Sequence, residues 1–218
     1  EMQVPKTGKV FEKNPLTPEE IDHLCSVLEE REEWQKLAYV KFTYSTGCRR
    51  AETIQLLKEV VNYEPKRKTV TIIDEDGKEQ EAESVSYKTH DIRCKGRSSV
   101  GKIRKLQFGQ DVMDVLKKWL EVRGDDDCPY VFVVKQKNGE TRQLSANVLN
   151  DWCIGEFSEI VGKRTTPHNF RRSRATNLVC YDHRALETAQ KLLGHESSET
   201  TQIYVIREDS DDADEAFI

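Results

Sequence analysis

The sequence predicts a mainly α fold (α+β) with one small three-stranded antiparallel sheet. Apolar residues recur at helical spacing before residue 60 and again after residue 110, whereas the stretch between them is β-branched and broken by turn residues. The 218 residues suit one substantial domain, and a composition of 36% apolar and 33% charged residues suits a highly charged globular protein.

The first helices are marked by their ends. Thr17-Pro18-Glu19-Glu20 is a capping box with proline at the first helical position, so it predicts a helix start. A second, more buried helix is expected from about Trp34 to Tyr44, with Gly47 ending it. A third helix is expected from about Arg50.

The sheet is predicted in the middle of the chain. Thr69–Ile73 is β-branched, and Asp76-Gly77 marks a turn after it. We expect Ser84–Arg93 as the second strand and Lys102–Phe108 as the third, joined by the basic, glycine-bounded segment Lys95–Gly101.

Helices resume after the sheet, and glycines end most of them. The expected elements are a helix around Val112–Leu120 ended by Gly124, a short extended piece at Tyr130–Val134, a helix around Leu149–Ile160 ended by Gly162, a helix opened by Pro167, a helix around Leu186–Leu193 ended by Gly194, and a last helix that carries Tyr204.

The net charge of −5 is unevenly distributed. Arg207–Ile218 carries six carboxylates and one arginine, so residues 1–206 sum to zero. Lys88–Lys105 holds seven Lys or Arg against one Asp, and Lys163–Arg174 holds five and no acid. A face that binds phosphates needs local positive charge rather than a positive total. Charge runs of this kind also occur on ordinary solvated surfaces.

The cysteines and the apolar runs exclude several classes of protein. The six cysteines form no CxxC pair and have no zinc-ligand spacing, so we interpret them as free thiols of a reducing cytoplasm and expect no metal site. No apolar run approaches the length of a membrane helix. Residues 1–14 are expected as a linker segment, and Glu1–Lys13 lacks the apolar region of a signal peptide.

Three polar motifs suggest phosphate chemistry. His168 and Arg171 share one face of the helix that Pro167 opens, at a helix N-terminus that attracts anions. Arg49 and Glu52 stand in Thr46-Gly47-Cys48-Arg49-Arg50-Ala51-Glu52 at a helix start. Leu193-Gly194-His195 is followed nine residues after its histidine by Tyr204. Each motif alone also fits a surface ion pair or a capping residue.

Together these motifs resemble the tyrosine recombinase (phage integrase) family. The patterns TGxRxxE, HxxR and LGHxSxxTTxxY occur in the family's order, and the match runs from Leu16 to Tyr204. The resemblance implies a catalytic domain over residues 15–206 with the family's helical DNA breaking-rejoining fold. It also implies the absence from this chain of the family's N-terminal core-binding domain. The acidic tail over residues 207–218 is unusual for the family. Compared with the family, residues Asp74–Glu83 look like an insertion.

The resemblance also implies a function. The chain would be a site-specific DNA recombinase or integrase that acts through a 3′-phosphotyrosyl intermediate without metal or ATP. Its partners would be double-stranded DNA and further copies of itself, with a tetramer on two duplexes, no membrane and no small-molecule cofactor. Alternatives are a type IB-like topoisomerase and a catalytically silent DNA-binding regulator derived from an integrase.

The family's roles carry over residue by residue. Arg49 and Arg171 resemble the phosphate-clamping arginines, with Arg50 a rival to Arg49, and Tyr204 resembles the nucleophile. His168 would accept the tyrosine proton or contact the phosphate. His195 matches the position that donates to a phosphate oxygen, and Glu52 matches the acidic residue that supports the site.

A lysine near the second and third strands would protonate the leaving 5′-oxygen. Lys95 is the first choice, Lys102 the second, and Lys88 a further possibility. The remaining contacts to DNA are expected from basic residues of the two cationic segments, namely Lys102, Arg104, Lys163, Arg164, Arg172 and Arg174.

Overall fold

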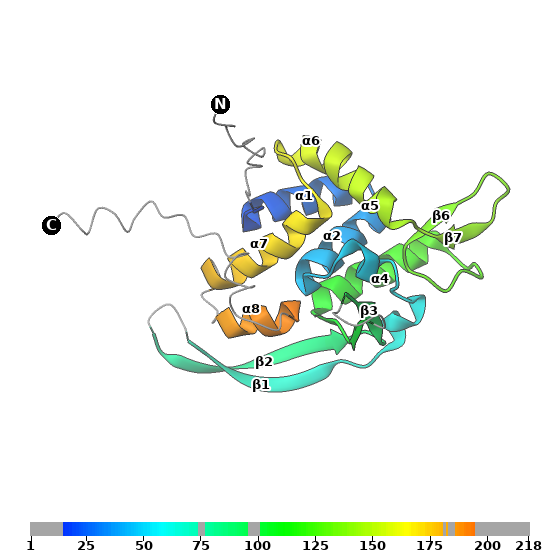
Figure 1. Ribbon diagram of the computed structural model, residues 1–218. Helices are drawn as coiled ribbons and strands as arrows, with labels where there is room; N and C mark the ends of the chain where they lie inside the picture. Colours follow the sequence, from blue (N-terminus) through cyan, green and yellow to red (C-terminus); the bar gives the residue numbers. More distant parts are fainter. Residues whose placement is uncertain (1–14, 74–76, 96–100, 181, 183–185, 195–218) are drawn as a thin grey trace, which may run out of the picture.

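The computed structural model describes residues 15–73, 77–95, 101–180, 182 and 186–194. Helices surround a central helix, α2, and strands lie along one side of them (Figure 1). The prediction of a mainly α fold with a small three-stranded antiparallel sheet is confirmed, and two two-stranded sheets accompany it in the described residues. The helical elements are α1 (Pro18–Glu30), α2 (Trp34–Thr46), α3 (Arg50–Thr53), the 3-10 helix η1 (Lys58–Asn62), α4 (Gln110–Arg123), α5 (Ala146–Trp152), the π-helical segment η2 (Cys153–Phe157), α6 (Ser158–Val161), α7 (Pro167–Cys180) and α8 (Leu186–Leu193).

Helix α1 begins with the predicted capping box. The Thr17 hydroxyl accepts a hydrogen bond from the Glu20 amide at 3.2 Å, and the Glu20 carboxylate accepts one from the Thr17 amide at 2.9 Å. No helix within the described residues is long and apolar enough to cross a membrane.

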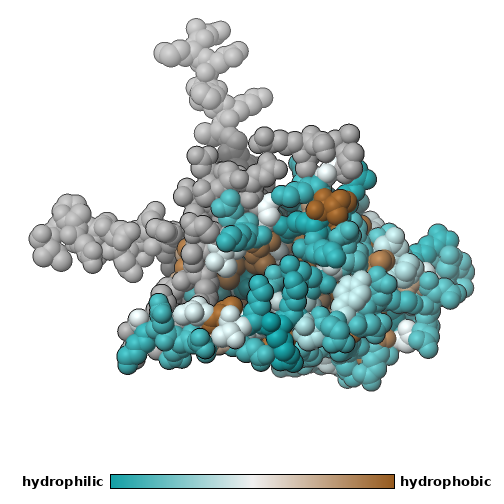
Figure 2. Space-filling model, turned by 90° about the horizontal axis from the view of Figure 1, so that it is seen from below, coloured by the Kyte–Doolittle hydropathy of each residue, from teal (hydrophilic) through white to brown (hydrophobic). Residues whose placement is uncertain are grey.

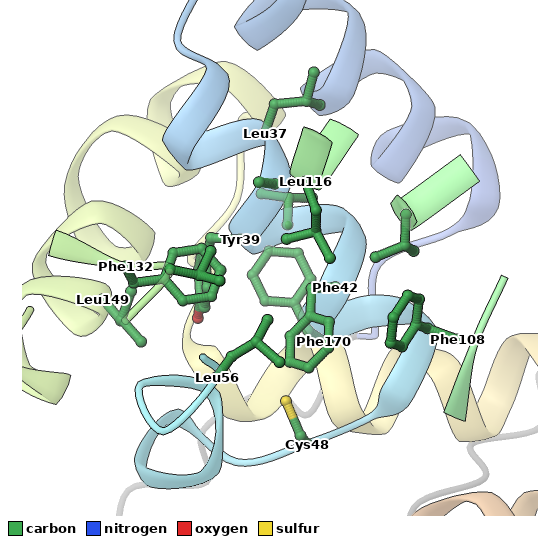
Figure 3. Packing of buried hydrophobic residues seen from close by; sticks show 14 of the residues in the cluster. Leu37, Tyr39, Phe42, Cys48, Leu56, Phe108, Leu116, Phe132, Leu149 and Phe170 are labelled. Carbon is green, nitrogen blue, oxygen red and sulfur yellow. The ribbon is translucent and has the colours of Figure 1, made fainter. Parts of the chain in front are cut away.

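The core is built around α2. Its Tyr39 and Phe42 are fully buried, and Tyr39 contacts the rings of Phe132, Phe157 and Phe170 at centroid distances of 6.1–6.2 Å. Figure 3 shows Tyr39 and Phe42 of α2 beside Phe132, with Phe170 of α7 next to them. Because burying a large apolar side chain contributes roughly 1.5–3 kcal/mol, this cluster fixes α7 against α2.

The first strand is longer than predicted, and the other two predicted strands are divided. They are β1 (Lys66–Ile73), β2 (Glu79–Lys88), β3 (Ile92–Cys94), β4 (Lys102–Arg104), β5 (Gln107–Phe108), β6 (Val133–Lys135) and β7 (Thr141–Gln143). The three-stranded sheet has the order β1-β2-β5, while β3 pairs only with β4 and β6 only with β7. The expected extended piece at Tyr130–Val134 therefore contributes to a separate hairpin.

Two of the predicted strands were wrong in their extent. Ser84–Arg93 is divided between β2 and β3, and Lys102–Phe108 between β4 and β5. The break occurs where the Thr89 hydroxyl accepts from the Leu106 amide at 2.9 Å, while the Thr89 amide donates to the Leu106 carbonyl at 2.9 Å. A side chain thus replaces a backbone acceptor there, and the regular ladder is interrupted.

The predicted insertion coincides with the far half of the β1–β2 hairpin. The two strands are paired from Lys66↔Ser86 to Ile73↔Glu79, and the hairpin runs below α8 in the view of Figure 1. Only its base joins the core, where Tyr87 stacks on Phe108 at 5.7 Å. The described side chains of β1 are exposed.

Candidate active site

The first component of the site is the turn after α2. Gly47 adopts φ +60°, which an L side chain rarely adopts, and an added Cβ would overlap the Leu193 side chain of α8. Arg49 follows in an extended conformation at the start of α3. Its amide donates to Glu52 Oε2 and its Nη1 donates to Glu52 Oε1, both at 3.0 Å. Glu52 therefore binds both the backbone and the side chain of Arg49.

Burial makes this ion pair asymmetric. The side chain of Glu52 is 2% exposed and that of Arg49 is 35% exposed. The buried Glu52 carboxylate fixes the position of the Arg49 guanidinium, and part of the Arg49 side chain remains exposed to solvent.

The second component is the start of α7. Pro167 opens the helix as predicted, and Arg171 lies one turn later with only 1% of its surface exposed. Arg171 Nη1 donates to the Gly47 carbonyl at 2.5 Å, and Nη2 donates to the Leu193 carbonyl at 2.8 Å. One guanidinium therefore joins α7 to the turn after α2 and to the end of α8.

The two components enclose a cavity of about 320 Å³. Arg49, His168 and Arg171 all line it, so three of the predicted residues meet although they are up to 122 positions apart. Arg50 also lines the cavity and donates to Asn147 at 3.5 Å. The other lining residues are Cys48, Asn150, Thr166 and Pro167.

The cavity is cationic, and this affects His168. Desolvation of the imidazole, followed by the charges of Arg172, Arg171 and Arg49, lowers the pKa of His168 below its usual 6.5, although the residue as a whole is exposed. The imidazole is therefore neutral at pH 7 and able to accept a proton. Cys48 does not compete as a nucleophile, because burial raises the pKa of its thiol.

Two of the lining residues were not predicted. Thr166 precedes Pro167, so the helix start itself was a signal for it. Asn150 lies inside α5 and had no sequence signal. Within the described ranges, no three His, Cys, Asp or Glu side chains are grouped so that they could hold a metal ion.

The candidate lysines lie outside this cavity. Lys95 directly follows β3, Lys102 begins β4 opposite Cys94, and Lys88 ends β2; all three are exposed. Lys88 and Lys102 line a separate groove of about 520 Å³ together with Arg104, Lys105 and Lys191. Figure 2, a view from below Figure 1, shows that the face on this side is largely hydrophilic. The choice of Lys95 remains a prediction.

The other basic residues differ in their contacts. Lys163 donates to the Pro15 carbonyl at 2.9 Å and pairs with Glu20. Arg174 lies over the Tyr44 ring at 5.5 Å and pairs with Asp182 at 3.8 Å. Arg172 is half-buried and Arg164 is exposed. His195 and Tyr204 lie outside the described residues, as does the acidic segment Arg207–Ile218.

Sequence comparisons relate the chain to known proteins. A family model described as the phage integrase family matches residues 14–210. The SPbeta prophage-derived recombinase-like protein YomM of Bacillus subtilis is 28% identical over 99% of this chain and 60% of its own length. The tyrosine recombinase XerA of Pyrococcus furiosus is 30% identical over 92% of this chain and 59% of its own length.

Solved structures show the same fold. A crystal structure of XerA recombinase superposes with a TM-score of 0.64 at 22% identity, covering 90% of this chain and 61% of that one. A XerH site-specific recombinase bound to palindromic difH substrate gives 0.60 at 21% identity, covering 93% and 54%. The chain thus spans about three fifths of the length of the curated relatives named above.

Proposed function

The chain belongs to the phage integrase family, and from this premise we propose that it cleaves and rejoins DNA strands. Tyr204 is the proposed nucleophile. Its oxygen attacks the scissile phosphorus, a 3′-phosphotyrosyl bond forms, and the bond to the 5′-oxygen breaks. His168 takes the tyrosine proton, and Lys95 gives a proton to the 5′-oxygen, which leaves as a hydroxyl.

The cavity between α3 and α7 is the observation that carries the proposal. Arg49 and Arg171 present two guanidinium groups that stay charged at any physiological pH and match phosphate oxygens. His168 beside them is neutral at pH 7, as a proton acceptor must be. The charge that develops on the pentavalent phosphate would be neutralised by these arginines without a metal ion.

The reaction would need no ATP, because the energy of the phosphodiester is kept in the protein–DNA bond. A 5′-hydroxyl from a second strand can then reverse the step, so four copies on two duplexes would exchange strands. DNA is supported as the partner by relatives whose solved structures contain it, such as XerH with difH substrate and the Tn1549 transposon integrase with circular intermediate DNA.

A nicked suicide DNA substrate tests this function, because loss of the short 5′-terminated fragment traps the covalent intermediate. We expect wild-type protein to form an adduct that maps to Tyr204, and Tyr204→Phe to bind the same DNA without forming it. An adduct of equal yield from Tyr204→Phe would refute the assignment of the nucleophile.

A further inference from the structure

Arg104 was predicted as a contact to DNA, but its described contacts point elsewhere. It lies in β4 on the floor of the groove that Lys88, Lys102, Lys105 and Lys191 also line. Those four lysines are exposed, whereas Arg104 is half-buried. Its Nη2 donates to the Leu192 carbonyl of α8 at 3.2 Å.

Gly194 at the end of α8 leaves room for the guanidinium of Arg104. Gly194 has φ +66°, and an added Cβ would overlap Nη1 of Arg104. The absence of a side chain at position 194 therefore has two reasons: the left-handed backbone, and the close approach of Arg104. A helix terminus also leaves carbonyl groups unpaired, and cations near it are stabilising.

A second arginine also donates a hydrogen bond to the end of α8. Arg171, which lines the cavity, donates to the Leu193 carbonyl at 2.8 Å, one residue beyond the carbonyl that Arg104 holds. Two guanidinium groups from different elements, α7 and β4, thus hold consecutive carbonyls of α8. The end of α8 is tied both to the phosphate cavity and to the hairpin that carries Lys95 and Lys102.

Arg104 also lies close to Glu52, the carboxylate that binds Arg49. Burial raises the pKa of the Cys94 thiol in β3; the Glu52 carboxylate raises it further, and the Arg104 guanidinium lowers it. Both charged groups therefore lie near Cys94.

We infer that Arg104 is a positioning residue for the strand-cleavage reaction: it fixes the end of α8 against the β3–β4 hairpin, so that Arg171, which bonds to the same helix end, and the hairpin lysine keep a constant position relative to each other. This inference rests on the proposed function. A misplacement of about 1 Å in such a site can cost roughly 100-fold in rate.

The test compares Arg104→Ala with Lys105→Met, a neighbouring cation of the same groove. Cleavage rates are measured in single turnover on the nicked substrate at saturating DNA, and Kd is measured over a range of salt. We expect Arg104→Ala to cleave roughly 100-fold more slowly with Kd unchanged. Lys105→Met is the comparison for a groove cation that acts through its charge alone, and it should lower the salt slope of log Kd by about 1, as the loss of one phosphate contact does.

A double variant at Arg104 and Gly194 distinguishes the loss of this contact from a general folding defect. Gly194→Asn tolerates the left-handed backbone but adds a Cβ, so we expect it to cleave slowly. The double variant Arg104→Ala/Gly194→Asn should be no slower than the slower single variant, because both remove one contact. Arg104→Lys should recover part of the rate, since a single ammonium can still donate to Leu192.

Two results would overturn the inference. One is an unchanged cleavage rate in Arg104→Ala, and the other is a change in Kd and salt slope like that of Lys105→Met. Multiplicative effects in the double variant would equally contradict it. Failure of the proposed function looks different, because the wild-type chain would then form no covalent adduct at all.

Discussion

The two cationic regions of the molecule are built in opposite ways. In the cavity between α3 and α7, Arg171 is 1% exposed and donates to two backbone carbonyls, and Arg49 is held by a carboxylate that is 2% exposed. On the strand side, Lys88, Lys95 and Lys102 are exposed. The arginines are fixed by the core, whereas the lysines depend on surface strands. We infer that the phosphate site is formed before DNA binds and that the proton donor is the less constrained component.

The largest effect on the cleavage rate is expected from the exposed lysines of the strand side. If Lys95 protonates the leaving 5′-oxygen, Lys95→Ala should slow cleavage by roughly 10²–10⁴-fold. A substrate with a 5′-bridging sulfur needs no such proton, because a thiolate leaves readily, and it should restore the rate. Lys102→Ala and Lys88→Ala are the matched controls. Rescue by sulfur in one of these controls, and not in Lys95→Ala, would move the role to that lysine.

A comparison of the two arginines tests the buried side. Both Arg49→Ala and Arg171→Ala should lose roughly 10²–10³-fold in cleavage. Arg171→Ala should also destabilise the fold by about 1–3 kcal/mol, because it leaves the buried carbonyls of Gly47 and Leu193 without their donors. Arg49→Ala should destabilise the fold as well, because the buried Glu52 carboxylate loses its cation. Urea unfolding measures both losses against wild type. An Arg171→Ala variant as stable as wild type would mean that the guanidinium of Arg171 has no structural role.

The motifs around Arg49 and Arg171 could be predicted from the sequence, whereas the hydrogen bonds that join these motifs to one another could not. The starts of α1 and α7 and the glycine after α2 are local signals, and the structure confirms them. The contacts of Arg171 with Gly47 and Leu193 depend on tertiary packing across 124 and 22 positions. The division of the strands at Thr89 depends on a side chain that replaces a ladder partner, which alternation of residue types does not reveal.

A smaller effect is expected at the turn after α2. Gly47→Ala forces an alanine into the left-handed region and onto Leu193, so it should destabilise the fold by more than the roughly 1–2 kcal/mol of backbone strain alone. Gly139→Ala is the control, because Gly139 has φ +84° with nothing within 4 Å of an added Cβ. Equal losses in urea unfolding would show that contact with α8 adds nothing.

The smallest effect is a shift in pH dependence. Since the pKa of His168 is lowered, the unfolded chain binds more protons than the folded one just below pH 6.5. The stability difference between wild type and His168→Gln should therefore fall as pH drops below 6.5. The second-order rate of cleavage at low DNA concentration, which reports groups of the free protein, should decline over the same range, and Arg172→Gln should move that decline to higher pH. A decline centred above 6.5 in wild type would contradict the assignment.

Arg49 and Arg171 are proposed to neutralise the negative charge of the scissile phosphate. A substrate with a neutral methylphosphonate at that position tests it most directly, with single-turnover cleavage measured for wild type, Arg49→Ala and Arg171→Ala. We predict that the defect of each variant shrinks strongly on the neutral substrate, because there is no longer a charge on the non-bridging oxygens to neutralise. Defects of the same size on both substrates would contradict the claim.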